Sequence, residues 1–330
     1  MNIQEIAERA GVSKGTVSKY LNRSGYVGKA TAARIQAVVD ETHYAPSRLA
    51  QALSTGGSLK LVGLICYDVC DLYYAKCASV LERRLREAGF EMILSCTGRS
   101  AKAVRSAVDS LARKNVDALI FIGSVFMEER GVIEDAAKRC PCFLINANLP
   151  AENVYSCYCD DGAAVQNAAE CLLAAGRKKL LYLYDAETYG AETKIRGFLR
   201  ALPDRRAAVK CGGDFSEMLA VLPRILSERK PDALLCSNDL IAAAVVRAAA
   251  MLGLRIPDDL AVVGHNNSVL SETCSPTVTS IDNRVEQLSE LTADNLVKRF
   301  QNQPFDSEIR VDAELVRRES FPATSSEQTK

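Results

Sequence analysis

The chain lacks long apolar runs, and this absence excludes one class of protein. None of its apolar stretches approaches the roughly 20 residues that a membrane-spanning helix needs. The first residues, Met1 to Glu5, also lack the basic and then apolar build of a signal peptide. We therefore expect a cytoplasmic protein without a membrane partner.

Groups for acid–base or metal chemistry are scarce. His43 and His265 are the two histidines in 330 residues. The sequence has neither the Gly-x-x-x-x-Gly-Lys-Ser/Thr phosphate loop nor the Gly-x-Gly-x-x-Gly dinucleotide fingerprint. Without clustered metal ligands, catalysis has no evident place. We expect a protein that is not an enzyme and that needs no cofactor and no metal.

The twelve cysteines do not have metal spacing. Cys140-Pro141-Cys142 and Cys157-Tyr158-Cys159 are pairs separated by one residue, and no Cys-x-x-Cys occurs. In a cytoplasmic chain such residues are typically reduced thiols that serve as small apolar side chains, here mostly on buried strands. Redox sensing and metal binding remain the alternatives.

Positive charge is concentrated at the start of the chain. Residues 1–60 hold eight Lys or Arg and four Asp or Glu, although the net charge of the whole chain is zero. The rest of the chain is therefore slightly negative. A basic head on an acidic body suits contact with phosphates through the head alone.

Three short helices are predicted within the first 46 residues. Asn2 and Glu5 have capping-box spacing at the start of the first helix, and Gly11 stops it. Ser13 caps a second helix that points Val17 and Leu21 inward, and a third is predicted over 30–42.

A break and a linker follow these helices. Tyr44-Ala45-Pro46-Ser47 interrupts the helical pattern, because the residue before proline avoids the α region. A short helix over 48–53 and a flexible Ser54-Thr55-Gly56-Gly57-Ser58 linker are expected next. We divide the chain into a helix-turn-helix domain over 1–46, a hinge and linker over 47–59, and a core over 60–330.

From Leu61 onwards, apolar strand-like runs alternate with helical stretches. The predicted strands are 61–66, 91–96, 118–123, 142–146, 180–184, 233–237 and 260–264, and helices include 74–88 and 239–252. This alternation predicts an α/β core of doubly wound parallel sheets with helices on both faces. More than 250 residues is much for one such sheet, so two similar lobes with a cleft are expected.

The second helix has the features of a DNA-reading helix. In a helix-turn-helix, the N-terminal residues of this helix face base edges in the major groove. Lys14 and Gly15 hold those leading positions, and Lys19 lies one turn further along. Ser13, Thr16 and Ser18 offer hydroxyls and amides to phosphates. A three-helix bundle for protein contact is the alternative.

The spacing of these residues resembles the lactose-repressor (LacI/GalR) family of bacterial transcription regulators. The matching pattern is Ile6-Ala7-x-x-Ala10-Gly11-Val12-Ser13-x-x-Thr16-Val17-Ser18-Lys19-x-Leu21-Asn22, then Tyr44-x-Pro46-x-x-x-Ala50-x-x-Leu53. The likeness continues to Leu315–Ser320, which is similar to the closing strand of the family. The DNA-binding residues that we infer are Ser13, Lys14, Gly15, Thr16, Ser18, Lys19, Asn22, Tyr44, Arg48, Ala50 and Leu53.

The resemblance implies a hinge helix over 49–54 that folds when a dimer meets the operator. Leu53 occupies the position of the leucine that enters the minor groove and kinks the duplex. Alternatively, Leu53 is a linker residue that packs on its own domain. Lys19 departs from the arginine usual in the family, and lysine acts as a point charge where arginine forms two parallel bonds to guanine.

The core resembles the periplasmic sugar-binding fold that the family uses as a sensor. In open α/β sheets, ligands bind beyond the carboxyl ends of strands. The effector-binding residues that we infer from those ends and from the family pattern are Asp68, Asp71, Asn146, Asp160, Lys194, Asn238, Asp239 and Asn266. For Asp239, a helix cap is as good an interpretation as a ligand contact.

Three family anchors are altered in this chain. Lys194, three residues before Gly197-Phe198, aligns with a ligand-gripping arginine, and Asn146 and Asn266 align with aspartates. Loss of two acids shifts the pocket towards positive potential, which favours an acidic ligand such as a sugar phosphate or a uronic acid. The alternative is that other aspartates at the strand ends take over and bind a neutral sugar.

Together these features predict a sequence-specific DNA-binding regulator, most simply a repressor. A single small module offers few base contacts, so a homodimer on a pseudo-palindromic operator is expected, with a tetramer also open. The resemblance implies that the lobes of the core supply the dimer contacts. A periplasmic transport protein would share the core but would need a signal peptide and would lack the basic head.

Overall fold

The computed structural model describes residues 2–22, 24–44 and 60–322. The chain splits into two compact units, Met1–Lys60 and Leu61–Lys330, which we describe separately. Among the described residues, no helix is long and apolar enough to cross a membrane. The predicted helix over 48–53 and the linker over 54–58 lie outside the described residues.

The described residues of the first unit form three helices, α1 (Ile3–Ala10), α2 (Lys14–Asn22) and α3 (Lys29–Thr42). The predicted capping box is present, because the Asn2 side chain accepts from backbone N–H groups and the Glu5 carboxylate accepts from the Asn2 N–H. Gly11 ends α1 with a φ of 64°, a conformation that glycine adopts without steric cost. Ile6, Val17 and Ile35 are fully buried where the three helices meet.

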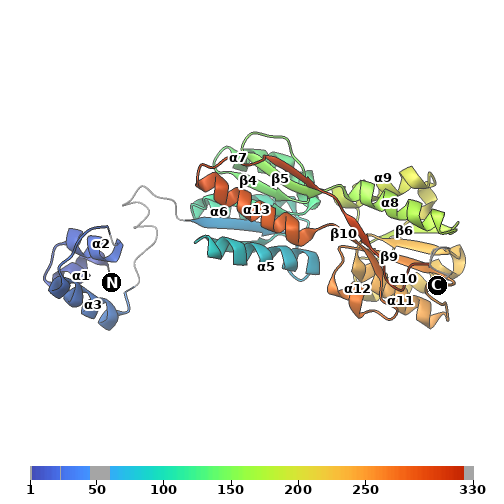
Figure 1. The fold of residues 1–330 in the computed structure, drawn as a ribbon, viewed down its shortest axis with the longest axis horizontal. Coiled ribbons are helices and arrows are strands. Elements are labelled where there is room, and N and C mark those ends of the chain that lie inside the picture. The colour runs from blue at the N-terminus through green and yellow to red at the C-terminus, as the bar shows by residue number, and fades with distance from the viewer. Residues whose placement is uncertain (1, 23, 45–59, 323–330) are drawn as a thin grey trace, which may run out of the picture. The chain divides into compact units, whose positions relative to one another are not determined.

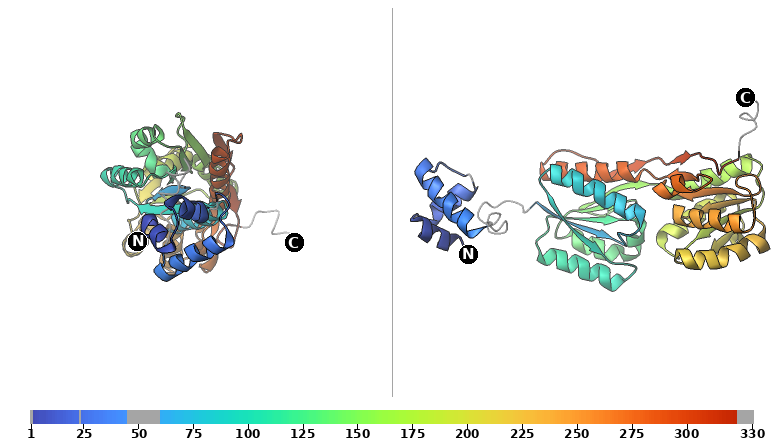
Figure 2. Two further views of the ribbon diagram at one scale, coloured as in Figure 1. Left: turned by 90° about the vertical axis from the view of Figure 1, so that its left-hand side faces the viewer. Right: turned by 90° about the horizontal axis from the view of Figure 1, so that it is seen from below.

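The first lobe of the second unit is a six-stranded sheet in the order β11-β5-β4-β3-β1-β2. Its strands are β1 (Leu61–Cys66), β2 (Glu91–Cys96), β3 (Ala118–Ile122), β4 (Cys142–Ile145), β5 (Val154–Cys159) and β11 (Glu308–Val311). Its helices are α5 (Leu72–Glu87), α6 (Ala101–Arg113), η1 (Ser124–Glu129), α7 (Arg130–Ala137) and α13 (Val285–Phe300). One face packs against α5 and α13 and the other against α6 and α7, so both faces are covered (Figures 1 and 2).

The second lobe repeats this architecture around a sheet in the order β12-β10-β9-β8-β6-β7. Its strands are β6 (Leu180–Tyr184), β7 (Ala208–Lys210), β8 (Ala233–Cys236), β9 (Ala261–His265), β10 (Thr279–Asp282) and β12 (Glu314–Val316). Its helices are α8 (Asp161–Ala174), α9 (Tyr189–Ala201), η2 (Arg205–Ala207), α10 (Phe215–Arg229), α11 (Asp239–Met251) and α12 (Val269–Thr273). A single apolar core joins the sheet to α8, α9, α10 and α11.

The chain passes between the lobes three times, after β5, after β10 and after β11. The seven predicted strands are present with ends that differ by at most one residue. The sequence analysis did not predict β5, β7, β10 and β11, which are short or carry polar residues. The strand β12 overlaps the segment 315–320 that resembles the closing strand of the family, but it spans Glu314–Val316. It corrects the expectation of purely parallel sheets, because β12 pairs antiparallel with β10.

Seven of the twelve cysteines are buried, three are partly exposed, and Cys70 and Cys96 are exposed. Burial raises the pKa of several buried thiols, such as Cys77 and Cys211, to about 12. These thiols are therefore protonated at neutral pH and pack as small apolar groups, as expected for most of the set.

Candidate functional site

The exposed face of α2 carries the residues predicted to read DNA. The Ser13 hydroxyl accepts a hydrogen bond of 3.2 Å from the Thr16 N–H and lies 2.9 Å from the Thr16 hydroxyl, which fixes the start of the helix. Lys14, Gly15 and Lys19 are exposed, whereas Val17 is fully buried. This arrangement presents cations and backbone N–H groups together on one accessible surface.

The other predicted contacts are distributed differently. Asn22 donates 3.2 Å to the Ser18 hydroxyl, so these two side chains form one polar pair at the end of α2. Tyr44 is partly buried against the apolar core of the head. Arg48, Ala50 and Leu53 lie outside the described residues, and their DNA contacts stay predictions.

Residues 11–15 also fit the Gly-x-Ser-x-Gly spacing found around hydrolase nucleophiles. That motif requires a sharp turn from a strand into a helix, with the serine exposed beside a histidine. Here the segment joins α1 to α2, and the Ser13 hydroxyl caps the helix. The motif therefore has no hydrolase context.

Tyr26 is an exposed residue that the sequence analysis missed. Its side chain is 92% exposed in the segment between α2 and α3, the highest value among the exposed large apolar residues. A large aromatic side chain with a hydroxyl at such a position is suited to a phosphate or base contact. Its position in a basic head was the signal available in the sequence.

A cavity of about 820 Å³, including its open mouth, lies at the carboxyl ends of strands from both lobes. From the first lobe it is lined by Tyr67, Asp71, Tyr73, Tyr74, Arg99, Gly123, Ser124, Val125 and Asn146. From the second lobe it is lined by Asp161, Asp185, Ala186, Thr188, Gly190, Ala191, Lys194, Ser237, Asn238, Asn266 and Asn283. In open α/β sheets, ligands bind at this location.

Five of the eight predicted effector residues line this cavity, namely Asp71, Asn146, Lys194, Asn238 and Asn266. Asp68, Asp160 and Asp239 do not line it. Asp68 accepts from the Cys70 N–H, and Asp160 caps α8 by accepting from the Ala163 N–H. These carboxylates therefore shape the turns beside the cavity.

Asp239 is neither a helix cap nor part of the cavity lining. Asn238 is the cap of α11, because its side-chain oxygen accepts from the Ile241 N–H. The Asp239 carboxylate is buried, where it accepts 2.6 Å bonds from the Ser280 hydroxyl and the Ser268 N–H. Burial raises the pKa of Asp239 despite these bonds. The expectation of a cap at this position was one residue out of place.

A buried polar chain connects Asn146, Asp161 and His265. The Asn146 amide donates 3.0 Å to one oxygen of Asp161, and the His265 ring nitrogen Nε2 lies 3.2 Å from the other. Burial alone would raise the pKa of Asp161, but the Lys194 charge and the His265 contact hold it at about 2. Burial and the Lys194 charge lower the pKa of His265. Asp161 is therefore an anion beside a neutral histidine at neutral pH.

Lys194 is the cation at the centre of the second-lobe wall. Its ammonium donates 3.0 Å to the backbone oxygen of Ser237, and its charge lowers the pKa of Asp161. The helix that carries it is held tightly, since a Cβ at Gly197 would lie 2.0 Å from the Gly162 oxygen of α8. Only glycines allow α8 and α9 to approach this closely.

Several lining residues were not identified from the sequence. Asp161 and Asp185 add two carboxylates, and Arg99 adds a cation whose guanidinium lies 5.3 Å from the centre of the Tyr67 ring. Each of them follows a strand end by a few residues, which was the available signal. The described lining thus carries three aspartates against two cations, so the expected positive potential is not found.

Three buried polar atoms of lining residues have no hydrogen-bond partner among the described residues. They are the Tyr73 hydroxyl, the Ser237 hydroxyl and the Asn283 side-chain oxygen. A buried polar group without a partner costs about 1–3 kcal/mol, so such atoms usually meet water or a ligand. They indicate where a bound molecule would form hydrogen bonds.

The lobes also touch directly beside the cavity. The Tyr189 N–H at the start of α9 donates 2.9 Å to the Glu128 carboxylate in η1 of the first lobe. A Cβ at Gly190 would lie 2.5 Å from the Ser124 hydroxyl, so glycine permits this approach.

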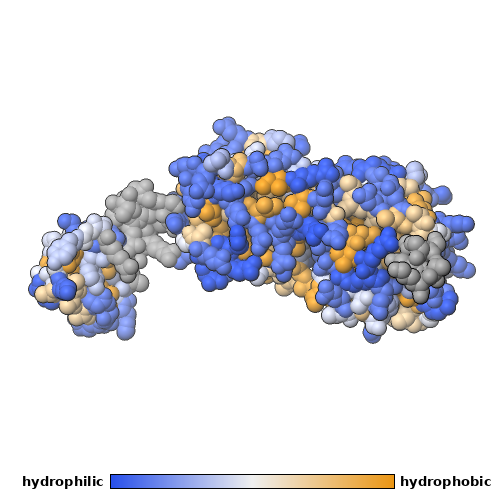
Figure 3. Space-filling view, viewed as in Figure 1, coloured by the Kyte–Doolittle hydropathy of each residue, from blue (hydrophilic) through white to orange (hydrophobic). Residues whose placement is uncertain are grey.

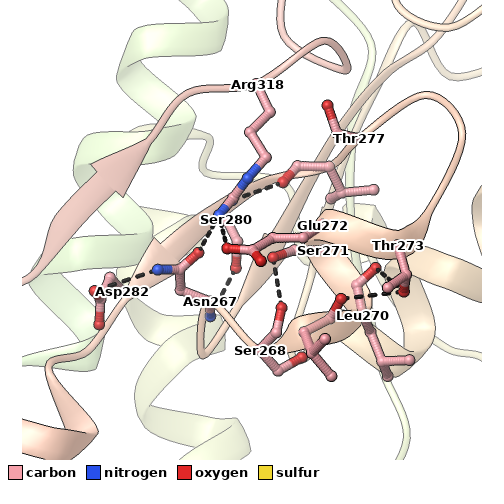
Figure 4. Close-up of polar contacts among 12 residues, drawn as sticks. Asn267, Ser268, Leu270, Ser271, Glu272, Thr273, Thr277, Ser280, Asp282 and Arg318 are labelled. Carbon is pink, nitrogen blue, oxygen red and sulfur yellow. Dashed lines mark hydrogen bonds and ion pairs between the residues drawn. The ribbon is translucent and has the colours of Figure 1, made fainter.

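The closing segment of the chain contacts the second-lobe loop that follows β9. Arg318 donates 2.7 Å to the Asn267 side-chain oxygen and forms a 3.2 Å ion pair with Glu272 (Figure 4). Asn267 N–H donates to the Ser280 hydroxyl, and its amide donates to Asp282. This network fixes the backbone immediately after Asn266, whose side chain accepts from Asn283.

Two family models match this chain, one in each of its two units. Residues 2–47 match the model of bacterial regulatory proteins of the lacI family, and residues 169–321 match a periplasmic binding protein-like domain. An HTH-type transcriptional regulator of Lachnoclostridium phytofermentans is 31% identical over 97% of this chain and 99% of its own. The chain belongs to the lacI family of bacterial regulatory proteins.

Other lacI-family relatives extend the likeness over nearly the whole chain. The ribose operon repressor of Halalkalibacterium halodurans is 28% identical over 96% of both chains. The HTH-type transcriptional repressor PurR of Vibrio vulnificus is 27% identical over 96% of this chain and 98% of its own. These relatives are transcription regulators, not enzymes, and this chain is a DNA-binding transcription regulator of the same family.

Solved structures show the same fold. The lac repressor dimer bound to operator and the anti-inducer ONPF has a TM-score of 0.84, with 24% identity over 98% of this chain and 99% of that chain. A LacI-family regulator from Silicibacter pomeroyi has a TM-score of 0.85 with 20% identity, over 97% of this chain and 99% of that one. The head and the two-lobed core therefore form one known architecture.

Proposed function

We propose that this chain is a repressor that binds a pseudo-palindromic operator as a homodimer, and that a sugar or sugar derivative in the cavity sets its operator affinity. The observation that carries the proposal is the cavity between the strand ends of the two lobes. It offers unpartnered Ser237 and Asn283 atoms together with three aspartates. Carboxylates accept hydrogen bonds from hydroxyl groups, and amides both donate and accept them.

The charge balance of the lining favours a neutral, polyhydroxylated ligand. Lys194 already faces Asp161 and donates to the Ser237 oxygen, so it is not the unpaired cation that an anionic ligand would require. Asp185 brings further negative charge to the same wall. Tyr67, Tyr73 and Tyr74 add aromatic surface on which the apolar face of a sugar ring can pack.

An acidic sugar derivative is the second candidate, and Arg99 is the observation that favours it. Its guanidinium lies over the Tyr67 ring, in the lining of the cavity. Arginine recognises carboxylates and phosphates through two parallel hydrogen bonds. An acidic group on the ligand would therefore contact the first lobe at Arg99.

A thermal-shift screen that pairs neutral sugars with their acidic or phosphorylated forms tests the ligand class. We expect stabilisation by one or more neutral sugars, with the shift reduced in Asn238→Ala and unchanged in Arg99→Gln. Stabilisation by acidic forms alone, lost in Arg99→Gln or Lys194→Gln, would establish the second candidate. Failure of every sugar would contradict a carbohydrate ligand.

Apolar surface on both lobes supports the homodimer. Leu72 at the start of α5 is 40% exposed and Val269 at the start of α12 is 56% exposed. Both line one surface hollow that α5 and α12 share, and Figure 3 shows apolar residues (orange) at that edge of the molecule. Exposed apolar side chains that share a hollow are typical of protein interfaces.

A further inference from the structure

Two thiols lie in contact at the carboxyl ends of β1 and β2. Cys66 and Cys96 are direct partners in the parallel ladder, and their sulfur atoms are 3.6 Å apart. Cys66 is buried, whereas Cys96 is exposed. Because β2 is the last strand of the first-lobe sheet, a small reagent reaches Cys96 from solvent without entering the core.

The backbone of this pair already suits a disulfide. Neighbouring strands lie about 4.7–4.9 Å apart, and the Cα atoms of a disulfide lie about 4.4–6.8 Å apart. Closing the bond to about 2.05 Å requires the two sulfur atoms to approach by about 1.5 Å, which side-chain rotation can supply. No separation of the strands is needed.

The environment assigns different roles to the two sulfur atoms. Burial, and then its hydrogen bond to Cys96, raise the pKa of Cys66 to about 12. Either sulfur can be the donor in the contact, but of the two only Cys96 is exposed, so it is the sulfur that an oxidant in solution reaches first. Thiolate character and exposure together determine which cysteine reacts with oxidants.

We propose that Cys66 and Cys96 form a dithiol that hydroperoxides oxidise to an intramolecular disulfide. The Cys96 thiolate attacks one oxygen of the peroxide, the O–O bond breaks, and hydroxide or alkoxide leaves and takes up a proton. The Cys66 sulfur then attacks the Cys96 sulfenic acid, the S–O bond breaks, and the departing hydroxide takes the Cys66 proton to form water. Two thiols are oxidised by two electrons, and one peroxide is reduced to water and water or an alcohol.

This site lies at the rim of the ligand cavity. Tyr67 follows Cys66 directly, and the Thr97 N–H donates 3.0 Å to the Cys66 oxygen. Gly98 N–H donates 2.9 Å to the Tyr67 oxygen, and Arg99 lies over the Tyr67 ring. A disulfide would therefore lie directly beside two lining residues. Any effect on the ligand depends on the proposed ligand-binding function, whereas the oxidation itself does not.

The test is differential alkylation of the full-length protein after exposure to hydrogen peroxide. Trypsin releases Cys66 in the peptide 61–76 and Cys96 in the peptide 87–99, whereas Cys77 falls in another peptide. We expect these two peptides to be joined, with the link lost after dithiothreitol. Cys171 and Cys274, which are partly exposed, are internal controls and should stay alkylatable under the same treatment.

Three variants separate this disulfide from other products. Cys70→Ser should keep the link, since Cys70 shares the peptide of Cys66 but is not the ladder partner of Cys96. Cys96→Ser should leave Cys66 free, and Cys66→Ser should stop at a sulfenic acid on Cys96 that dimedone traps. A link through Cys70, a link between two chains through Cys96, or oxidation of Cys171 and Cys274 at the same rate would overturn the proposal. The proposal would also be overturned if Cys66 remained fully alkylatable after exposure to peroxide.

Discussion

The Asn146 side chain in the first lobe donates a 3.0 Å hydrogen bond to the Asp161 carboxylate, with which the second lobe begins. The same amide accepts a 3.1 Å bond from the Cys159 N–H through its oxygen. An ionised aspartate at position 146 could accept from Cys159 but could not donate to Asp161. The amide at position 146, which departs from the family pattern, therefore has a structural reason that is independent of the ligand.

Asn146→Asp should destabilise the protein. It replaces a buried donor with a second carboxylate beside Asp161, which is held ionised with a pKa of about 2. We expect a loss of about 1–3 kcal/mol in the free energy of unfolding at pH 7, measured by urea denaturation. Asn302→Asp is the matched control. Like Asn146, Asn302 has a positive φ, of 54°, but its side chain is exposed. Equal effects of the two substitutions would contradict this role for Asn146.

Acid should destabilise the core in two steps. The lowered pKa of His265 means that unfolded chains take up a proton as the pH falls below about 6.5, while the folded state resists it. The pKa of Asp161 is about 2 in the folded protein, against 3.8 for an ordinary aspartate. Because of this difference, the free energy of unfolding falls by about 2 kcal/mol more as the pH falls from about 4 to 2. Melting temperatures at pH 7.5, 6 and 5 test the first step. In His265→Gln the fall over this range should be smaller, and an unchanged fall would exclude His265 as its cause.

Lys14 and Lys19 should contribute to sequence reading. Both are exposed in α2, whereas Val17 in the same helix is buried. Replacing a base-reading lysine with alanine should weaken operator binding by about 1–3 kcal/mol and relax specificity at one base pair. Binding to a set of operators with single base changes measures this. Lys29→Ala is the control, a charge change at the start of α3. It should weaken binding to all the operator sequences equally.

Leu53→Ala should act on DNA shape. Leu53 lies outside the described residues, so this prediction rests on its match to the family pattern. We expect less bending and lower affinity across the whole site, with half-site preference unchanged. Circular-permutation gels report the bend, and an unchanged bend would refute the wedge.

Val269→Asp should weaken the dimer. The substitution replaces an exposed apolar side chain in the hollow that Val269 shares with Leu72 by a charge, and burial of that charge against a partner would be costly. Sedimentation should show a shift from dimer to monomer, whereas Val269→Thr, of similar size, should shift it less. A wild-type protein that stays monomeric even with operator DNA would refute the homodimer itself.

The sequence predicted the fold closely because its signals were local. The capping box of Asn2 and Glu5, the glycine stop at Gly11 and the buried apolar strands depend on neighbouring residues, and the structure has all of them. The strand β11 was missed because it is short and pairs with residues far along the chain. Its alternation alone is too brief to distinguish it from loop.

The ligand cavity was predicted less completely, since strand ends indicate a region but not the direction of each side chain. Asp160 and Asp161 both follow β5, yet Asp160 caps α8 while Asp161 lines the cavity. Asn238 and Asp239 divide differently, because Asn238 both caps α11 and lines the cavity, whereas Asp239 does neither. Which member of such a pair faces the ligand depends on where the helix begins, and one residue changes the answer.

Titration of the protein's own upstream DNA with the full-length chain, followed by fluorescence anisotropy, tests the regulator account most directly. We expect saturable binding that survives excess unrelated DNA and weakens steeply with salt, because the basic head contacts phosphates. Addition of the sugar that stabilises the protein best in the thermal-shift screen should change the operator dissociation constant, and the change should be lost in Asn238→Ala. Operator binding that is no tighter than binding to unrelated DNA, or that is indifferent to a sugar bound in the cavity, would contradict the account.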